Sequence, residues 1–250
     1  MTARHPRTAS RQSHEGPKIW KEAFWPAEWL SLRMSPVYRG VGIPHGDGGP
    51  VVVVPGFLCS DAVMGEMYGW LGRIGYRPYL SRIGLNVDCP TESGHRLADT
   101  VERAYRATGR RVRIVGHSLG GVVARKAALE TPEHVSQLIY MGSPIRGVHA
   151  HPAIVATANA LISVRSITGV HKPTPTCGCR MTVDKTPLPE YIHRAAIYTR
   201  ADGVVDWHDA RKRDPRRNHE VGGTHIGLVY NPRAYQVLGE LLAEAEAPVV

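Results

Sequence analysis

The feature that most constrains the fold is a series of short apolar runs that alternate with helical patterns. The first run, Val51 to Val54, is four valines between two prolines, which is typical of a strand buried on both faces. Further strands are expected at residues 76–80, 112–115, 135–141, 195–198 and, more weakly, 219–222. Helical periodicity occupies the stretches between or after them, at residues 63–73, 94–108, 120–130 and 235–245. This alternation predicts an α/β fold with a mostly parallel sheet of about six strands and helices on both faces.

Composition narrows the class of protein further. The chain has 250 residues, 42% of them hydrophobic and 21% charged, which suits one ordinary domain with a full core. No apolar run approaches the roughly 18 to 20 residues that span a bilayer, and no export signal is visible, so a cytoplasmic protein with reduced cysteines is expected. The four cysteines are too few for a disulfide scaffold.

Two segments fall outside the alternating pattern at the amino end. The net charge is +9, and the first 21 residues hold five basic side chains against one acidic, so residues 1–18 are interpreted as a disordered basic tail before a domain at 19–250. Apolar and aromatic residues then recur near helical spacing over 19–32. This stretch is expected to be a helical segment packed on the domain, with docking on a lipid surface as the alternative.

The motif that carries chemistry is Gly116-His117-Ser118-Leu119-Gly120-Gly121, which begins where a predicted strand ends and opens a predicted helix. The pattern G-x-S-x-G in this setting predicts a nucleophile elbow. Ser118 must adopt a strained backbone on a tight turn to raise its hydroxyl above the sheet, and glycines on both sides leave room for that turn. Backbone N–H groups at the start of the helix can then stabilise an oxyanion.

A serine nucleophile needs a base and an orienting acid, which in such folds follow in the order Ser, acid, His on loops after later strands. His225 lies between glycines just after the last predicted strand. Asp202 follows the strand before it and precedes the apolar pair Val204-Val205, which is expected to anchor the loop. Asp202 is therefore predicted as the acid, with Asp206 on the same turn as the alternative.

The oxyanion donors are predicted to be the backbone N–H groups of Phe57 and Leu119. Pro55-Gly56-Phe57-Leu58 follows the first buried strand, where the second donor of an oxyanion hole is expected. Gly56 allows a sharp turn there, which would direct the Phe57 N–H toward the site. Leu119 follows the nucleophile directly.

Taken in order, these stretches resemble the α/β-hydrolase superfamily, and in particular its bacterial lipase- and esterase-like members. Gly142-Ser143-Pro144 and Gly223 to Gly227 add to the resemblance, which covers about residues 36–246. It implies ester substrates, and it implies that the insertion at about 145–192, which interrupts the alternation, is a cap over the site. The chain departs from the family in leaving no obvious room for an opening β-hairpin.

Other clusters receive ordinary interpretations. Cys177 and Cys179, with His171 nearby, lack a second ligand pair at zinc-finger spacing, so a local disulfide or cap packing is favoured over a metal. The basic loop Arg211 to Arg217 is expected to be solvated, with weak contact to an anionic membrane surface as an alternative. Nucleic acid is disfavoured because no aromatic interleaving accompanies the charge.

The sequence thus predicts a cofactor-free, metal-free serine hydrolase that cleaves small-molecule or lipid esters through an acyl-enzyme. Ser118 is the predicted nucleophile, His225 the base and Asp202 the acid. The same residues would also serve an acyltransferase or a thioesterase, and a non-catalytic binding module on a hydrolase scaffold is the alternative of a different class. No pattern in the sequence indicates the oligomeric state.

Overall fold

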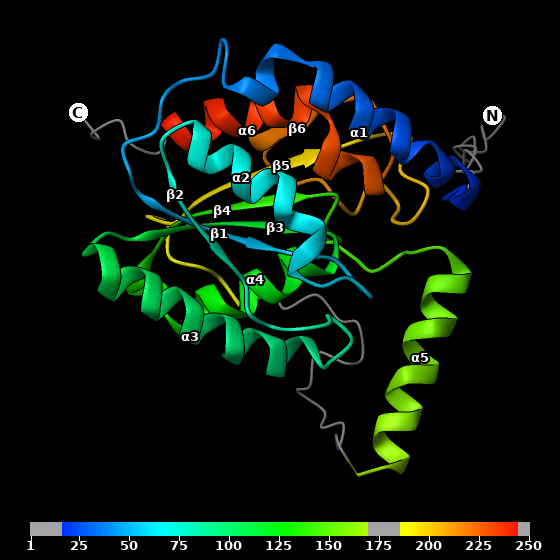
Figure 1. Cartoon of the computed structure of the whole chain (residues 1–250). Coiled ribbons are helices and arrows are strands. Elements are labelled where there is room, and N and C mark those ends of the chain that lie inside the picture. The colour runs from blue at the N-terminus through cyan, green and yellow to red at the C-terminus, as the bar shows by residue number, and fades with distance from the viewer. Residues whose placement is uncertain (1–16, 170–185, 245–250) are drawn as a thin grey trace, which may run out of the picture.

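The computed structural model describes residues 17–169 and 186–244 and contains one sheet (Figure 1). The predictions for residues 1–16, and for His171, Cys177 and Cys179, lie outside the described residues. The six strands are all parallel, in the order β2-β1-β3-β4-β5-β6. Their bounds are Pro50–Val54 (β1), Arg77–Leu80 (β2), Val112–His117 (β3), Val135–Met141 (β4), His193–Tyr198 (β5) and Asn218–Glu220 (β6). The predicted sheet is therefore confirmed.

Helices cover both faces of this sheet. Figure 1 shows α1, α2 and α6 on one face, and α3 and α4 on the other. The helices are Trp25–Met34 (α1), Gly65–Arg73 (α2), Pro90–Thr108 (α3), Leu119–Glu130 (α4), Pro152–Ile167 (α5) and Pro232–Glu244 (α6). Short 3₁₀ turns include Ile19–Phe24 (η1) and Ile226–Tyr230 (η7). This is the α/β-hydrolase arrangement that the sequence predicts.

The core is divided by the sheet, as the valine run of β1 requires. Val51 and Val53 pack with Trp70 of α2 and Tyr235 of α6, whereas Val52 and Val54 pack with α3 and α4. All four valines are fully buried. Successive side chains of a strand point to opposite faces, so an uninterrupted apolar run is what a sheet covered on both sides needs.

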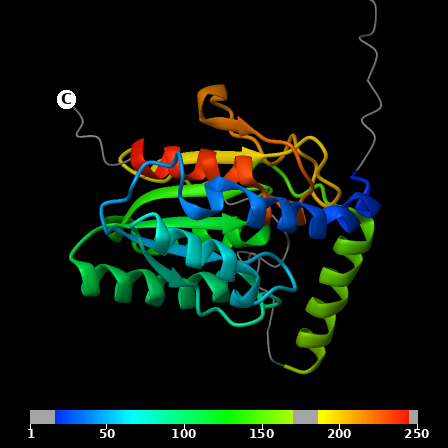
Figure 2. The same ribbon diagram turned by 45° about the horizontal axis from the view of Figure 1, so that its top comes forward.

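The amino-terminal segment, residues 17–34, lies along one side of the body as a 3₁₀ turn followed by α1 (Figure 2). The burial of its side chains does not follow their hydrophobicity. Trp20 is 63% exposed and Phe24 58%, whereas Glu22, between them, is only 6% exposed. Leu32 is its fully buried apolar residue.

The described part of the insertion after β4 contains a long helix, α5, which both views place beyond the carboxyl ends of the strands and apart from the sheet (Figures 1 and 2). It meets the body through Ile162, which packs against Cys89, and through an ion pair between Arg165 and Asp88. Ile167 is 86% exposed. Of the described helices, none is long and apolar enough to cross a membrane.

Candidate active site

Ser118 occupies the turn between β3 and α4, at the carboxyl edge of the sheet. Its backbone has φ 52° and ψ −127°, a conformation that costs free energy and that this turn imposes. The Ser118 N–H donates to the carbonyl of Met141 on β4 over 2.8 Å, which ties the turn to the next strand. Ser118 is 8% exposed. A strained serine between a buried strand and a helix is the local geometry of a nucleophile elbow.

The glycines around Ser118 are required by close approaches of main chain. A Cβ on Gly116 would lie 2.6 Å from the Cα of Gly121, and a Cβ on Gly120 would lie 2.5 Å from the carbonyl oxygen of Pro55. Neither contact is to a side chain that can rotate away. The spacing of the motif therefore reflects the packing of α4 against β1 and β3.

Asp202 and His225 form a buried pair on the loops that follow β5 and β6. The His225 Nδ1–H donates to Asp202 Oδ2 over 2.7 Å, and both side chains are almost completely buried. The other carboxylate oxygen of Asp202 accepts the N–H groups of Val204, at 2.9 Å, and Val205, at 2.7 Å. The carboxylate is thus held on both sides, and His225 is held in the tautomer that leaves Nε2 free to accept a proton.

Asp206, the alternative acid, is hydrogen-bonded to a different histidine, His208. Its Oδ1 accepts the N–H and the Nδ1–H of His208, at 2.9 and 2.8 Å. Burial would raise the pKa of Asp206, but these hydrogen bonds outweigh it and lower the pKa. The structure brings Asp202, and not Asp206, against His225.

The electrostatics around His225 favour its protonation. Burial by itself would lower the pKa of His225, but the negative charges of Asp202 and Glu22 outweigh burial and raise it above 6.5. The neighbouring His117 behaves oppositely, because burial and the repulsion of His225 lower its pKa to about 3. His117 therefore stays neutral, and its Nε2–H donates to the His225 carbonyl over 2.9 Å.

The loop after β1 passes directly over Ser118. A Cβ on Gly56 would lie 3.0 Å from the Cβ of Ser118. The buried Asn86 holds this loop: its side-chain NH₂ donates to the Pro55 carbonyl over 2.9 Å, and its backbone carbonyl accepts the Leu58 N–H over 3.1 Å. Phe57 lies between these anchors, and Leu119 is the first residue of α4, where an N–H has no partner within the helix. Both predicted oxyanion donors thus belong to segments that border the serine.

Two carboxylates that sequence reasoning missed lie behind the histidine loop. Glu22 accepts N–H groups from both the acid loop and the histidine loop, and Glu28 accepts the N–H and the hydroxyl of Thr224, each at 2.8 Å. Burial raises the pKa of Glu28, against the lowering effect of Thr224. Two glutamates in an aromatic helical stretch are no signal by themselves, since their partners lie about 200 residues further along the chain.

A family model matches the chain from its first strand onward. The model of the palmitoyl protein thioesterase family matches residues 50–199, from the start of β1 to just beyond β5. The chain belongs to this family. The matched region includes Ser118 and the Gly56 loop and ends before Asp202. The chain is thereby also a member of the α/β-hydrolase superfamily.

Individual relatives agree with this assignment. The chain is 27% identical over 140 residues to a triacylglycerol lipase of Burkholderia plantarii, covering 51% of this chain and 39% of the lipase. It is 29% identical over 107 residues to a triacylglycerol lipase of Pseudarthrobacter phenanthrenivorans, covering 39% of this chain and 34% of that one. The matches thus span well under half of these relatives. The Bacillus licheniformis lipase BlEst2 in its mature form shares the fold, with a TM-score of 0.58, 21% identity, and coverage of 81% of this chain and 95% of that one.

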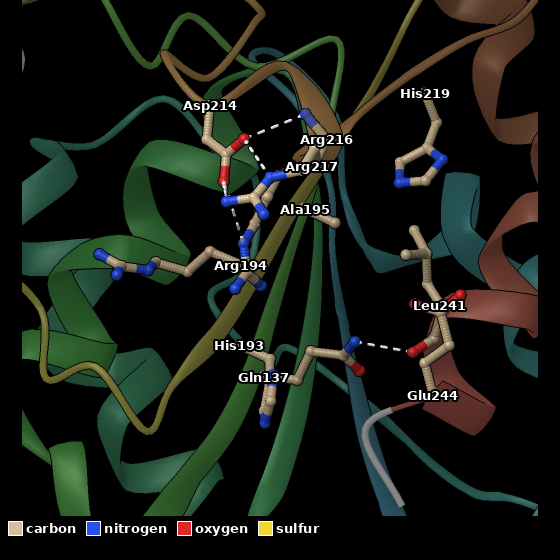
Figure 3. Close-up of a pocket in the computed structure, with 10 residues that line it drawn as sticks. All are labelled: Gln137, His193, Arg194, Ala195, Asp214, Arg216, Arg217, His219, Leu241 and Glu244. Atoms are coloured by element: carbon tan, nitrogen blue, oxygen red, sulfur yellow. Dashed lines mark hydrogen bonds and ion pairs between the residues drawn. The ribbon is translucent and has the colours of Figure 1, made fainter. Parts of the chain in front are cut away.

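A separate pocket of about 400 Å³ lies at the amino-terminal ends of β4, β5 and β6, opposite to the end where Ser118 lies (Figure 3). The basic loop reaches it through Arg216 and Arg217, both of which pair with Asp214. Gln137 closes its floor and donates to the Leu241 carbonyl over 2.8 Å. The charge of the basic loop is therefore partly neutralised and lies away from Ser118. Among residues 17–169 and 186–244, no group of three or more metal-binding side chains is present.

Proposed function

We propose that the chain is a serine hydrolase that cleaves acyl esters through an acyl-enzyme intermediate. The observation that carries the proposal is that a strained Ser118 at the elbow and a buried Asp202–His225 pair both lie at the carboxyl ends of the strands. Open α/β sheets place their sites at the carboxyl ends of the strands, where all three residues lie. The chain order Ser, Asp, His is that of α/β-hydrolases.

In the proposed mechanism, His225 Nε2 takes the proton of the Ser118 hydroxyl as its oxygen attacks the ester carbonyl carbon. Asp202 stabilises the imidazolium that forms and keeps its Nδ1 protonated. The N–H groups of Phe57 and Leu119 stabilise the negative oxygen of the tetrahedral intermediate. His225 then protonates the leaving alcohol or thiol. In the second half of the reaction, His225 takes a proton from a water molecule as the water oxygen attacks the acyl carbon, and it returns this proton to the Ser118 oxygen as the acid is released.

The family match favours thioesters as a second substrate class beside oxygen esters. Both present the same carbonyl carbon to Ser118 and differ in the leaving atom, so the proposed residues serve either. The relatives named as lipases and the family named for a palmitoyl thioesterase both point to long acyl groups. We propose that α5, which has partly buried Ile154, Leu161 and Ile162, contributes to binding such a chain as part of a cap.

Ser118→Ala tests the proposal. Turnover of p-nitrophenyl esters and of acyl-thioester substrates should fall about 10⁴-fold or more, and labelling by a fluorophosphonate should vanish. Ser136→Ala is the control, because it removes a serine hydroxyl of the same sheet that donates to the Val112 carbonyl over 3.4 Å, where β3 and β4 begin and Ser118 does not lie. An S118A variant with wild-type turnover would refute the serine mechanism.

Two further measurements separate the alternatives. Comparing water with alcohols as acceptors for one activated ester distinguishes hydrolysis from acyl transfer. A wild-type protein that neither turns over any ester nor reacts with fluorophosphonate would favour a binding module instead.

A further inference from the structure

The carboxylate of Glu22 lies at the junction of the two loops that carry Asp202 and His225. Its Oε1 accepts the N–H of Gly203 over 2.8 Å and the N–H of His225 over 3.0 Å, and its Oε2 accepts the N–H of Ile226 over 2.7 Å. One buried side chain thus holds backbone groups from both loops. The residues that it joins are 181 to 204 positions away in the sequence.

The loops are shaped to admit this side chain. A Cβ on Gly203 would lie 2.7 Å from Glu22 Oε1 and 2.6 Å from the Lys18 carbonyl oxygen. A Cβ on Gly227 would overlap the carboxylate of Glu28, the second acid of the segment. Glycine in each loop therefore leaves the space that the amino-terminal segment fills.

We propose that Glu22 is a positioning residue of the active site, which locks the acid loop to the histidine loop and places a second negative charge behind His225. The inference rests on the proposed catalytic role of His225. Glu28 supports the same loop one residue earlier, through the N–H and hydroxyl of Thr224. The amino-terminal segment would then be part of the catalytic machinery rather than a covering helix.

The charges that face His225 give the inference a distinctive pH signature. Asp202 from the β5 loop and Glu22 from η1 are negative, while His117 from the end of β3 is neutral, since its pKa is lowered to about 3. Glu28 lies beyond Thr224 and is not among the groups that shift the pKa of His225. Removing the charge of Glu22 should therefore lower the pKa of His225, with Asp202 still in place.

The test is Glu22→Gln, compared with Glu22→Asp and Glu66→Gln. An amide at 22 has one oxygen where the carboxylate has two, so it loses at least one of three N–H bonds and the charge. Aspartate keeps the charge but is shorter by one methylene. Glu66 anchors the same segment through Trp29 and Arg33, at 3.0 and 3.3 Å, without touching either loop. It reports what loosening the segment does by itself.

For E22Q we expect kcat to fall about 10- to 100-fold, as for a misplaced catalytic base, with KM for a short soluble ester changing less than about threefold. The acid limb of kcat/KM should move to lower pH in E22Q and stay in place in E22D and E66Q. The same shift should appear when the His225 ring is titrated by NMR, a measurement that needs no turnover. It should also appear in the pH dependence of fluorophosphonate labelling.

Unchanged kcat and an unshifted His225 titration in E22Q would overturn the inference, as would equal losses in E22Q and E66Q with no shift in either. Its failure is distinguishable from that of the proposed function. If S118A is inactive while E22Q behaves as wild type, only the role of Glu22 is wrong. If S118A keeps wild-type turnover, the serine mechanism is wrong, and the NMR titration still decides whether Glu22 sets the charge state of His225.

Discussion

Replacing Asp202 by asparagine should disable His225 through a forced choice of amide orientation. The carboxylate accepts three N–H groups, one from the His225 ring on Oδ2 and those of Val204 and Val205 on Oδ1. An amide has one oxygen. If the amide oxygen points toward the His225 ring, the NH₂ group points at the two backbone N–H groups. If the amide oxygen points toward the backbone, the NH₂ group points at the ring Nδ1.

The orientation with the amide oxygen toward the backbone keeps one more hydrogen bond. It should be more stable by about 1 to 3 kcal/mol, the cost of an unsatisfied buried donor. The ring Nδ1 must then accept, so its proton moves to Nε2, and Nε2 can no longer take the proton of Ser118. Loss of the charge-assisted bond to the imidazolium adds about 1.5 to 3 kcal/mol. Together these terms predict a fall in kcat/KM of about 10² to 10⁴-fold.

The assay is kcat/KM on a soluble p-nitrophenyl ester, with the unfolding midpoint measured in parallel. Asp206→Asn is the matched control on the same turn, because its carboxylate contacts His208 and should change kcat/KM only a few-fold. A D202N variant that keeps more than about a tenth of the wild-type value would refute the reasoning. The reverse ranking of the two variants would transfer the acid role to Asp206.

Three further predictions follow from the same geometry. Protonated His225 cannot act as a base and its pKa is raised, so kcat/KM should fall as pH drops through a value above 6.5; an acid limb at or below 6.5 would contradict the raised pKa. Gly120→Ala places a methyl against main-chain carbonyls at the end of β1 and should destabilise the fold by about 3 kcal/mol or more in urea unfolding. The control Gly65→Ala, at the open start of α2, should lie within about 1 kcal/mol of wild type. Leu161→Glu on α5 should lower kcat/KM for long-chain esters more than for acetate, since each buried methylene contributes about 0.8 kcal/mol; equal losses would remove α5 from the acyl site.

The sheet and the elbow could be predicted because their signals are local. The valine run of β1 is buried on both faces, and its burial is legible from four consecutive residues. The glycines of the elbow reflect contacts within one strand–turn–helix unit and the strand beside it. Asp202 and His225 follow from chain order once the strands are placed, because parallel strands end at one edge.

The burial of the amino-terminal segment could not be predicted from the sequence. Trp20 and Phe24 belong to the apolar residues that recur near helical spacing, yet both are exposed, whereas the charged Glu22 between them is buried. Burial of a carboxylate is costly unless it is hydrogen-bonded, and the three N–H groups that compensate Glu22 are contributed by residues that lie far away in the chain. Hydrophobic periodicity depends only on the side chains of one segment. It therefore does not indicate that a carboxylate is buried against N–H donors from a distant part of the chain. For the same reason the glycines at 203 and 227, which the sequence presents as loop punctuation, acquire a role only when the glutamates that fill their space are known.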